Sequence, residues 1–479
     1  MQNLALATIL LPFAGAALTV LGPQRMAKWV ALLFAALASL SVIQLALAFS
    51  AAGKTAATTA LLSLGSTVLM GLTIDRISVL VAVAVVTLGF LVIAYSTAYL
   101  SLGNREHPHE GRPRYYAFLL LFIGAMAGLV LSSTLIGQLV FFEITGACSW
   151  GLIGYYEKPK ALQSAIKALL ITHVASIGLY VAAAYLFVQT GSFELTSLSG
   201  LGEGAKVVVF LGILIAAWGK SAQLPLHAWL PDAMEAPTPV SAYLHAASMV
   251  KVGVYIYARA IYSAGAVPEI IGWVGTIAAV ITMLYGFLMY LPQKDMKRLL
   301  AYSTISQLSL IFMALSLSIF GSQLAFNGGI AHIFNHAFAK SLFFLVAGAL
   351  SYSCGTRMLP SLRGLLRHVP LLGVSFCVAA LGITGVPPFN GFFSKFAIFS
   401  AGFQLSSAHL LLLPLVVLAL IESVASFAWF LRWFGDTTPG EASEAVANAQ
   451  PVPLVIKLVL AVLIVMCVAS SFIAAAWLG

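Results

Sequence analysis

Ionisable side chains stand in the middle of long apolar segments of this 479-residue sequence. Four are lysines, Lys220, Lys251, Lys340 and Lys395, and Glu143 adds a carboxylate. Each charge at the centre of a bilayer costs about 2.5–3.5 kcal/mol unless it is paired or hydrated. Groups kept at that cost favour a path for protons or ions, because desolvation brings lysine and glutamate closer to exchanging protons near neutral pH. The alternative for any one of them is a static ion pair.

Histidines extend this set. His332 and His336 precede Lys340 at four-residue intervals, so the three side chains share one face of a helix. A histidine accepts a proton at one ring nitrogen and donates one at the other. The stripe therefore predicts a proton relay, and core histidines satisfied by their neighbours are the alternative. The other candidates for the proton pathway are His245 and, as secondary ones, His173 and Glu422.

The composition requires a membrane to hold these groups. Hydrophobic residues make up 61% of the chain and charged residues 8%, whereas a soluble domain has about 25% charged residues. A water-soluble enzyme and a disordered chain are both excluded. We predict an all-α polytopic membrane protein with about fourteen transmembrane helices, near 4–22, 27–49, 75–100, 115–132, 134–156, 162–188, 206–229, 239–262, 268–291, 296–319, 324–352, 370–400, 408–433 and 453–477.

Two regions of this pattern are less regular. Residues 50–74 do not fit a span, and the stretch around Gly65 predicts short extended segments. The helix at 296–319 carries several hydroxyl and amide side chains. These side chains either hold water or pack against neighbouring helices. The residues that carry them are Ser303, Thr304, Ser306 and Gln307.

Two predicted helices, the seventh and the twelfth, are broken close to a deep lysine. The helix breaks follow Lys220 and precede Lys395, and the residues that make them are Pro225, Pro231, Gly385, Pro387, Pro388 and Gly391. Such breaks are tolerated in a membrane only where the freed backbone groups meet protein or water, and paired breaks are typical of transporters built from repeats. We predict two inverted five-helix repeats, and divide the chain into 1–110, 111–265, 266–435 and 436–479.

The distribution of Lys and Arg predicts the orientation. Alternate loops hold 14 basic residues on one side and four on the other, and the four are Lys54, Arg76, Lys206 and Arg259. The positive-inside rule then places both termini outside. An acidic loop at 436–450 lies inside. The net charge of +9 forms no nucleic-acid-binding face, and the four cysteines form no CxxC pair, so no cysteine-held metal site is expected.

Three long motifs carry a resemblance to a known family. KSAQLPLHAWLPDAMEAPTPVSAYLHAASMVKVGVY (220–255), NHAFAKSLFFLVAGAL (335–350) and GVPPFNGFFSK (385–395) resemble the proton-pumping antiporter-like subunits. These subunits occur in respiratory complex I, in Mrp-type sodium/proton antiporters and in group 4 membrane-bound hydrogenases. The shorter motifs FFEITGACSW, NREHPH and SYSCGTR resemble component D of hydrogenase-4, of the formate hydrogenlyase type.

The resemblance implies a role for each deep group. Glu143 and Lys220 match a glutamate–lysine pair on the fifth and seventh helices, whose opening or closing acts on Lys251, the central lysine. A proton then passes towards Lys395, where Phe396 departs from the acidic residue of a complex I relative. The relay between them matches His245, His332, His336 and Lys340.

The resemblance also implies a larger complex. We expect a proton-translocating, non-catalytic subunit of a membrane-bound nickel–iron hydrogenase in a bacterial inner membrane. Its partners would be lipid, other antiporter-like membrane subunits and a peripheral hydrogenase arm, with no nucleic acid. No cofactor, metal or redox centre is expected in this chain, and the Ni-Fe and iron–sulfur centres would lie in partner subunits. The alternatives are a non-pumping structural scaffold and an Mrp-type Na+/H+ antiporter subunit.

Overall fold

Long helices account for nearly the whole of the computed structural model, which describes residues 1–479. Eleven helices are long and apolar enough to cross a membrane. They are α1 (Gln2–Leu21), α2 (Ala27–Ala51), α3 (Arg76–Tyr99), α4 (Pro113–Leu131), α5 (Leu135–Ile153), α6 (Pro159–Thr190), α11 (Glu269–Tyr290), α12 (Met296–Ser318), α13 (Gln323–Cys354), α17 (Leu412–Thr437) and α19 (Leu454–Leu478).

The other three predicted spans are interrupted helices. The seventh is α7 (Glu203–Lys220) followed by a turn and α8 (Trp229–Asp232), and the twelfth is α15 (Pro370–Thr384) with α16 (Asn390–Ser406). Both breaks were predicted from proline and glycine. The eighth was predicted as one helix but is α9 (Thr238–Ala246) and α10 (Met249–Ala264). The prediction missed this break because no proline or glycine marks it; Ser248 bonds back to Tyr243 O instead.

Freed backbone groups at the break after α7 are met by protein. Trp229 Nε1 donates to Gly219 O at 2.9 Å, and the backbone N–H of Gln223 donates to Trp218 O at 2.8 Å. A helix can therefore end inside the bundle without leaving these carbonyls unpaired. The break places Lys220 at the last position of α7, where its side chain is fully buried.

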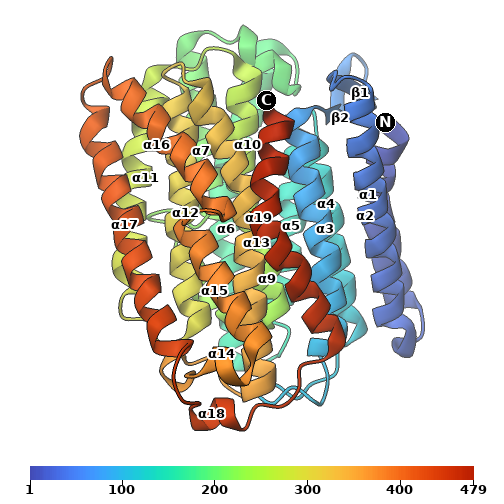
Figure 1. The fold of residues 1–479 in the computed structure, drawn as a ribbon. Helices are drawn as coiled ribbons and strands as arrows, with labels where there is room; N and C mark the ends of the chain where they lie inside the picture. The colour runs from blue at the N-terminus through green and yellow to red at the C-terminus, as the bar shows by residue number, and fades with distance from the viewer.

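The predicted extended segments form a hairpin. Strands β1 (Ala57–Leu64) and β2 (Thr67–Ile74) pair antiparallel, with Ala57 opposite Ile74 and Leu64 opposite Thr67. Gly65 lies in the turn with a φ of 61°, a left-handed conformation that glycine adopts without strain. Figure 1 shows the hairpin and both chain ends at one end of the bundle, and the short helices α14 (Leu365–His368) and α18 (Glu444–Ala447) at the other.

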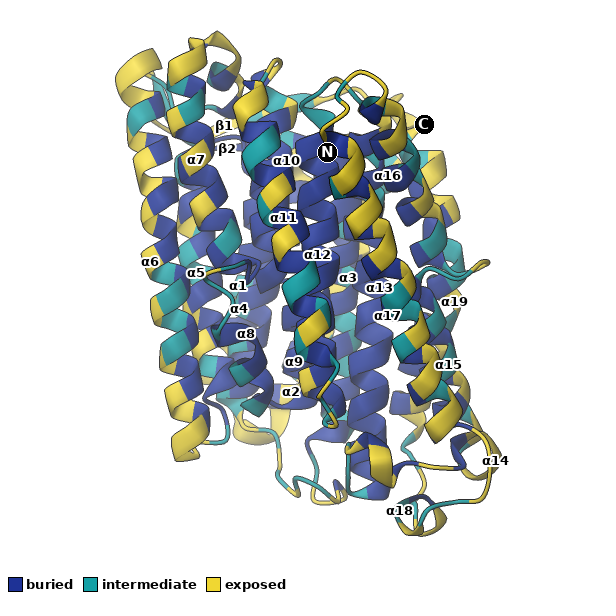
Figure 2. Ribbon diagram, turned by 90° about the vertical axis from the view of Figure 1, so that its left-hand side faces the viewer, coloured by how far each residue is buried: buried dark blue, intermediate teal, exposed yellow.

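The burial pattern places the most polar helices in the centre. Exposed residues lie on the outer helices of Figure 2, among them α6 on the left and α11 and α17 in front, while the helices behind them are mostly buried. The membrane-length segments of α12 and α13 are buried completely. A helix with hydroxyl, amide and ionisable side chains is shielded from lipid in this position.

Two of the four basic residues that the orientation argument assigned to external loops are buried in helices. Arg259 is in α10, 2% exposed, and forms a buried ion pair with Asp75 at the start of α3. Lys206 is in α7 and donates to the carbonyls of Ala264 and Ala266. The loop assignment was wrong for both, because the partners that make their burial tolerable are distant in sequence.

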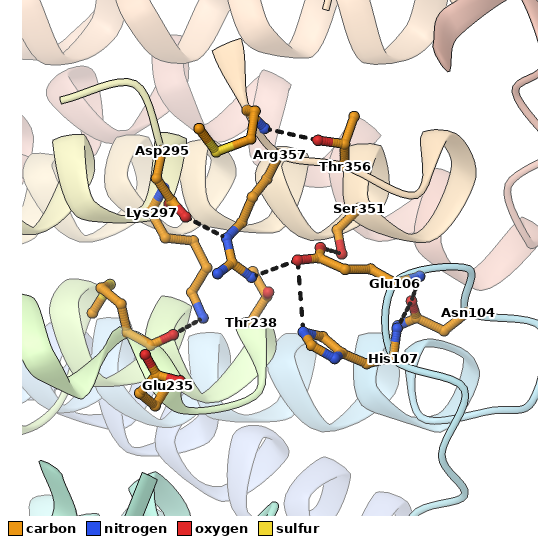
Figure 3. A network of polar contacts seen from close by, with 12 residues as sticks. Asn104, Glu106, His107, Glu235, Thr238, Asp295, Lys297, Ser351, Thr356 and Arg357 are labelled. Carbon is orange, nitrogen blue, oxygen red and sulfur yellow. Dashed lines mark hydrogen bonds and ion pairs between the residues drawn. The ribbon is translucent and has the colours of Figure 1, made fainter. Parts of the chain in front are cut away.

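Ion pairs clamp the loops together at one end of the bundle. Arg357 donates to Glu106 Oε1 at 2.8 Å and to Asp295 Oδ2 at 2.9 Å, and so joins three loops (Figure 3). Lys297 nearby donates to two backbone carbonyls in the turn that precedes α9. Burial lowers the pKa of His107 below its usual value, although Glu106 beside it acts to raise that pKa. These contacts fix the loops around the end of the central helices.

Candidate functional site: a buried line of ionisable side chains

The relay stripe of α13 has the geometry that its spacing predicted. His332, His336 and Lys340 are at most 3% exposed, and the rings of the two histidines have centroids 6.0 Å apart. The Nε2 atom of His336 is buried and has no hydrogen-bond partner within the protein. One nitrogen of that ring therefore stays available for proton exchange.

Lys251 joins this stripe directly. Its Nζ lies 3.0 Å from Nδ1 of His336, and the lysine is 1% exposed. No carboxylate lies within ion-pair distance of Lys251. The central lysine thus has a proton-accepting neighbour rather than a fixed counter-charge. A static ion pair is excluded for this residue.

Helix α12 contacts four ionisable groups through its polar side chains. Ser303 bonds Lys340 at 3.0 Å, and Thr304 lies 3.3 Å from Nδ1 of His245. Further along the helix, Gln307 lies 3.2 Å from His332 Nε2, and Ser306 donates to Glu422 at 2.7 Å. Two uses were considered from the sequence, holding water and packing against neighbouring helices, and the structure adds contacts with titratable groups. Each one holds a titratable group in place.

The line continues to the broken helix. His332 Nδ1 lies 2.8 Å from Ser394 Oγ, and Ser394 directly precedes Lys395. The Lys395 ammonium donates to Thr384 O, a carbonyl at the end of α15, and to Ser423 of α17. A cavity of about 570 Å³, lined mostly by phenylalanines of α16 and residues of α17, reaches Lys395.

The acidic group at this end lies on α17. Glu422 is 3% exposed and accepts hydrogen bonds from Ser306 and Ser426, both at 2.7 Å. Phe396, by contrast, is 63% exposed and supplies no polar group to this cluster. Glu422 directly precedes Ser423, the residue that bonds Lys395, and is therefore the carboxylate of this end of the line. The sequence placed it only among the secondary candidates.

The expected Glu143–Lys220 ion pair is not formed. Lys220 Nζ donates to Phe142 O at 2.9 Å and to Thr145 Oγ1 at 3.2 Å. Glu143 Oε2 instead lies 2.8 Å from Nε2 of His173 on α6. The physical reason is the direction of the side chains around α5, because Glu143 faces α6 whereas the carbonyl and hydroxyl that hold Lys220 face α7.

Each broken helix thus ends beside a lysine and a serine or threonine. The sequence signal for the lysines was depth in an apolar segment, and the structure brings all four into the bundle interior. Of the serines that hold them or lie beside them, Ser303 was noted in the sequence among the polar side chains of its helix, whereas Ser394 and Ser423 had no signal of their own. Serine is common in packed transmembrane helices, and only the contact with a distant ionisable group distinguishes these three.

Comparison with known proteins places the chain in a family. Residues 132–422 match the model described as NADH:quinone oxidoreductase/Mrp antiporter, TM, and residues 62–116 match that of NADH-ubiquinone oxidoreductase (complex I), chain 5 N-terminus. A Na(+)/H(+) antiporter subunit from Alkalihalophilus pseudofirmus is 38% identical over 77% of this chain and 48% of that protein. A Na(+)/H(+) antiporter subunit from Staphylococcus haemolyticus is 35% identical over 82% of this chain and 51% of that protein. The chain spans about half the length of these relatives.

Solved structures show the same fold. A chain of the Mrp complex from Dietzia sp. superposes with a TM-score of 0.87 and 30% identity, over 99% of this chain and 51% of that one. A chain of the membrane-bound sulfane sulfur reductase, an archaeal respiratory membrane complex, gives a TM-score of 0.83 and 25% identity, over 99% and 95%. These relatives do not support the finer resemblance to hydrogenase-4 component D, which short motifs cannot distinguish from other branches. The chain belongs to the antiporter-like membrane subunits shared by complex I and Mrp antiporters.

Proposed function

We propose that this chain is a proton-translocating subunit of an Mrp-type Na+/H+ antiporter complex. The observation that carries the proposal is the buried series Lys251, His336, His332 and Lys395. Lys251 contacts His336 at 3.0 Å, the two histidine rings have centroids 6.0 Å apart, and His332 contacts Ser394, the residue before Lys395, at 2.8 Å. The named antiporter proteins among the relatives favour this branch over the hydrogenase one.

The contacts support a sequence of proton transfers. Lys251 and His336 share one hydrogen bond, so a proton given up by Nζ passes to Nδ1 of the ring. His336 passes a proton from its unpartnered Nε2 towards His332, whose Nδ1 faces Ser394 beside Lys395. Lys340 and His245 are held by adjacent residues of α12 and act as further stations. Each unit charge moved against the membrane potential costs about 2.3 kcal/mol per 100 mV.

The orientation and partners form part of the same proposal. Both chain ends lie at one end of the bundle (Figure 1), as an even number of spans requires. We place that end outside a bacterial inner membrane, on the excess of basic residues in the opposite loops. The partners are other antiporter-like membrane subunits, since the similar structures are multi-subunit membrane complexes.

A second candidate is a proton-translocating subunit of a redox complex. The sulfane sulfur reductase chain favours it, because the match covers 95% of that chain. In this case a peripheral arm, such as that of a hydrogenase or formate hydrogenlyase, would carry the Ni-Fe and iron–sulfur centres, and this chain would carry none. The non-pumping scaffold is the third possibility that the experiment below must separate.

The test measures sodium-driven proton movement in everted vesicles that contain the whole complex. Addition of NaCl should release protons from acidified wild-type vesicles, and Lys251→Met should abolish the response with the complex still assembled. Lys457→Met is the matched control, since Lys457 is exposed near the start of α19. Proton movement driven only by an electron donor supports the redox candidate. A Lys251→Met complex that equals wild type identifies a scaffold.

A further inference from the structure

A polar cavity opens beside the turn that joins α1 and α2, at the end of the bundle opposite both chain ends (Figure 1). Its volume is about 560 Å³, within the usual range for a small-molecule site. The turn and the start of α2 form one wall of the cavity. The end of α3, the loop that follows it and the first part of α4 form the other. No residue of the central ionisable line takes part.

Two basic side chains line this cavity without a counter-charge. Arg25 and Lys28 form no ion pair, and the only acid of the lining is Glu110. The arginines just beyond the cavity, Arg112 and Arg114, are by contrast both paired with one glutamate. The cavity therefore has a net positive charge that the chain itself does not neutralise.

The hydroxyl groups of the lining divide into donors and acceptors. Thr97 and Ser101 donate their hydroxyl hydrogens to backbone carbonyls of α3, so their oxygens are left as acceptors. Tyr116 is 2% exposed and adds a phenol to the lining. A Cβ atom at Gly111 would lie 2.8 Å from that phenol oxygen, so the glycine leaves room beside it. The lining thus offers donors to an anion and acceptors to hydroxyl groups.

The surroundings of the cavity belong to the membrane surface. Helices α1 and α2 are both long enough to cross a membrane, and only residues 22–26 separate them. Trp29 is 54% exposed, and the Lys28 ammonium lies 5.3 Å from its ring centroid. Tryptophan is typical of the membrane–water interface. Exposed leucines continue from Trp29 along one face of α2 at intervals of four, four and three residues, and they are Leu33, Leu37 and Leu40.

We propose that this cavity binds the headgroup of an anionic phospholipid, phosphatidylglycerol. The phosphodiester lies between Arg25 and Lys28 and accepts a hydrogen bond from the Tyr116 hydroxyl. The glycerol hydroxyls donate to Glu110 and to the acceptor oxygens of α3, and an acyl chain follows the exposed apolar stripe of α2. The single negative charge of this lipid matches the net charge of the lining, whereas a zwitterionic lipid would leave that charge in place. The inference is independent of the ion that the complex transports.

The first experiment counts lipid in the purified complex. Wild-type and Arg25→Gln/Lys28→Gln complexes are washed in detergent, and the phosphatidylglycerol extracted from each is measured by mass spectrometry. The double variant should retain one molecule fewer per complex, and equal amounts would overturn the proposal. Lys294→Gln/Arg298→Gln is the matched control, because it removes two exposed basic residues that do not line the cavity. This control should retain as much lipid as wild type.

The second experiment measures affinity in nanodiscs of phosphatidylcholine that contain brominated phosphatidylglycerol. Bromine quenches nearby tryptophan, and the signal of Trp29 is obtained in each variant as the difference from the same protein with Trp29→Phe. Arg25→Gln/Lys28→Gln should raise the half-saturating lipid fraction about thirtyfold, since each basic side chain near the surface contributes about a factor of five. Tyr116→Phe keeps the charge of the site and should raise it about fivefold.

Three outcomes of this second experiment contradict the proposal. Equal quenching by brominated phosphatidylethanolamine would show that the cavity does not select a negative charge. A loss of affinity in Lys294→Gln/Arg298→Gln as large as that in Arg25→Gln/Lys28→Gln, with Tyr116→Phe unchanged, would show diffuse attraction to a basic surface. Displacement of the brominated lipid by soluble glycerol phosphate would assign the cavity to a soluble phosphate ester instead.

Discussion

The contact between Lys251 and His336 leads to a quantitative prediction. Their nitrogens are 3.0 Å apart and both residues are buried. Two unit charges at that distance repel by about 5–6 kcal/mol at an effective dielectric constant of about 20. Such a penalty disfavours double protonation by about four powers of ten. The pair therefore carries one proton at a time, and the histidine is an obligatory acceptor rather than a spacer.

His336→Gln tests this reasoning most directly. The glutamine amide oxygen still accepts a hydrogen bond from Lys251, so packing and assembly should survive, but the side chain cannot take up the proton. We expect the rate of sodium-driven proton movement in vesicles to fall by about a hundredfold or more, the usual contribution of a proton-transferring group. His368→Gln is the control, because His368 is exposed at the end of the bundle.

The result that would refute the reasoning is equally definite. A His336→Gln complex that is assembled to wild-type level and keeps half of the wild-type rate shows that protons bypass His336. The contact seen at 3.0 Å would then be structural. Native gel electrophoresis of the same vesicle preparations measures assembly, and separates loss of transport from loss of the complex.

Three further predictions concern contacts outside this pair. Ser306→Ala removes a donor to the buried Glu422 and should lower the unfolding free energy of the purified chain by about 1.5–3 kcal/mol, seen as a lower Tm. Arg357→Gln removes the two ion pairs through which Arg357 joins the loops at one end of the bundle. Since these ion pairs are partly exposed, the unfolding free energy should fall by about 1 kcal/mol or less, and by less still in high salt. Burial alone would raise the pKa of Asp75, but Arg259 holds it below its usual value. The stability that the Asp75–Arg259 pair confers is thus present above the carboxyl pKa of the unfolded chain, and it is lost as the pH falls towards the lower pKa of Asp75 in the folded chain. Asp75→Asn should flatten the acid unfolding curve over this pH range, and an unchanged curve would contradict the prediction.

The sequence alone predicted the helices, their breaks and their faces well where a local rule applies. Hydropathy located the helical segments, because a bilayer demands about twenty apolar residues in succession. Proline and glycine located the breaks near Lys220 and Lys395, since both residue types disturb the helical backbone. The four-residue spacing of His332, His336 and Lys340 placed them on one face. The repeat boundaries and the role of each site residue remain predictions.

Contacts between distant segments were beyond these rules. The break between α9 and α10 has no proline or glycine, and depends on a serine bonding to the preceding turn. The pairing of Arg259 with Asp75 joins residues 184 positions apart. Glu143 pairs with His173 rather than Lys220, because rotation around α5 decides which neighbouring helix each side chain meets.

The amino-acid sequence by itself therefore determined that charged groups lie within the membrane, and which helices carry them, because the energetic rules involved act along a single segment. Only the tertiary structure decided which group meets which. The polar side chains of α12 show this most clearly, since four ordinary residues there hold Lys340, His245, His332 and Glu422. Partner choice follows from how helices pack and rotate against one another, and that packing is a property of the whole bundle.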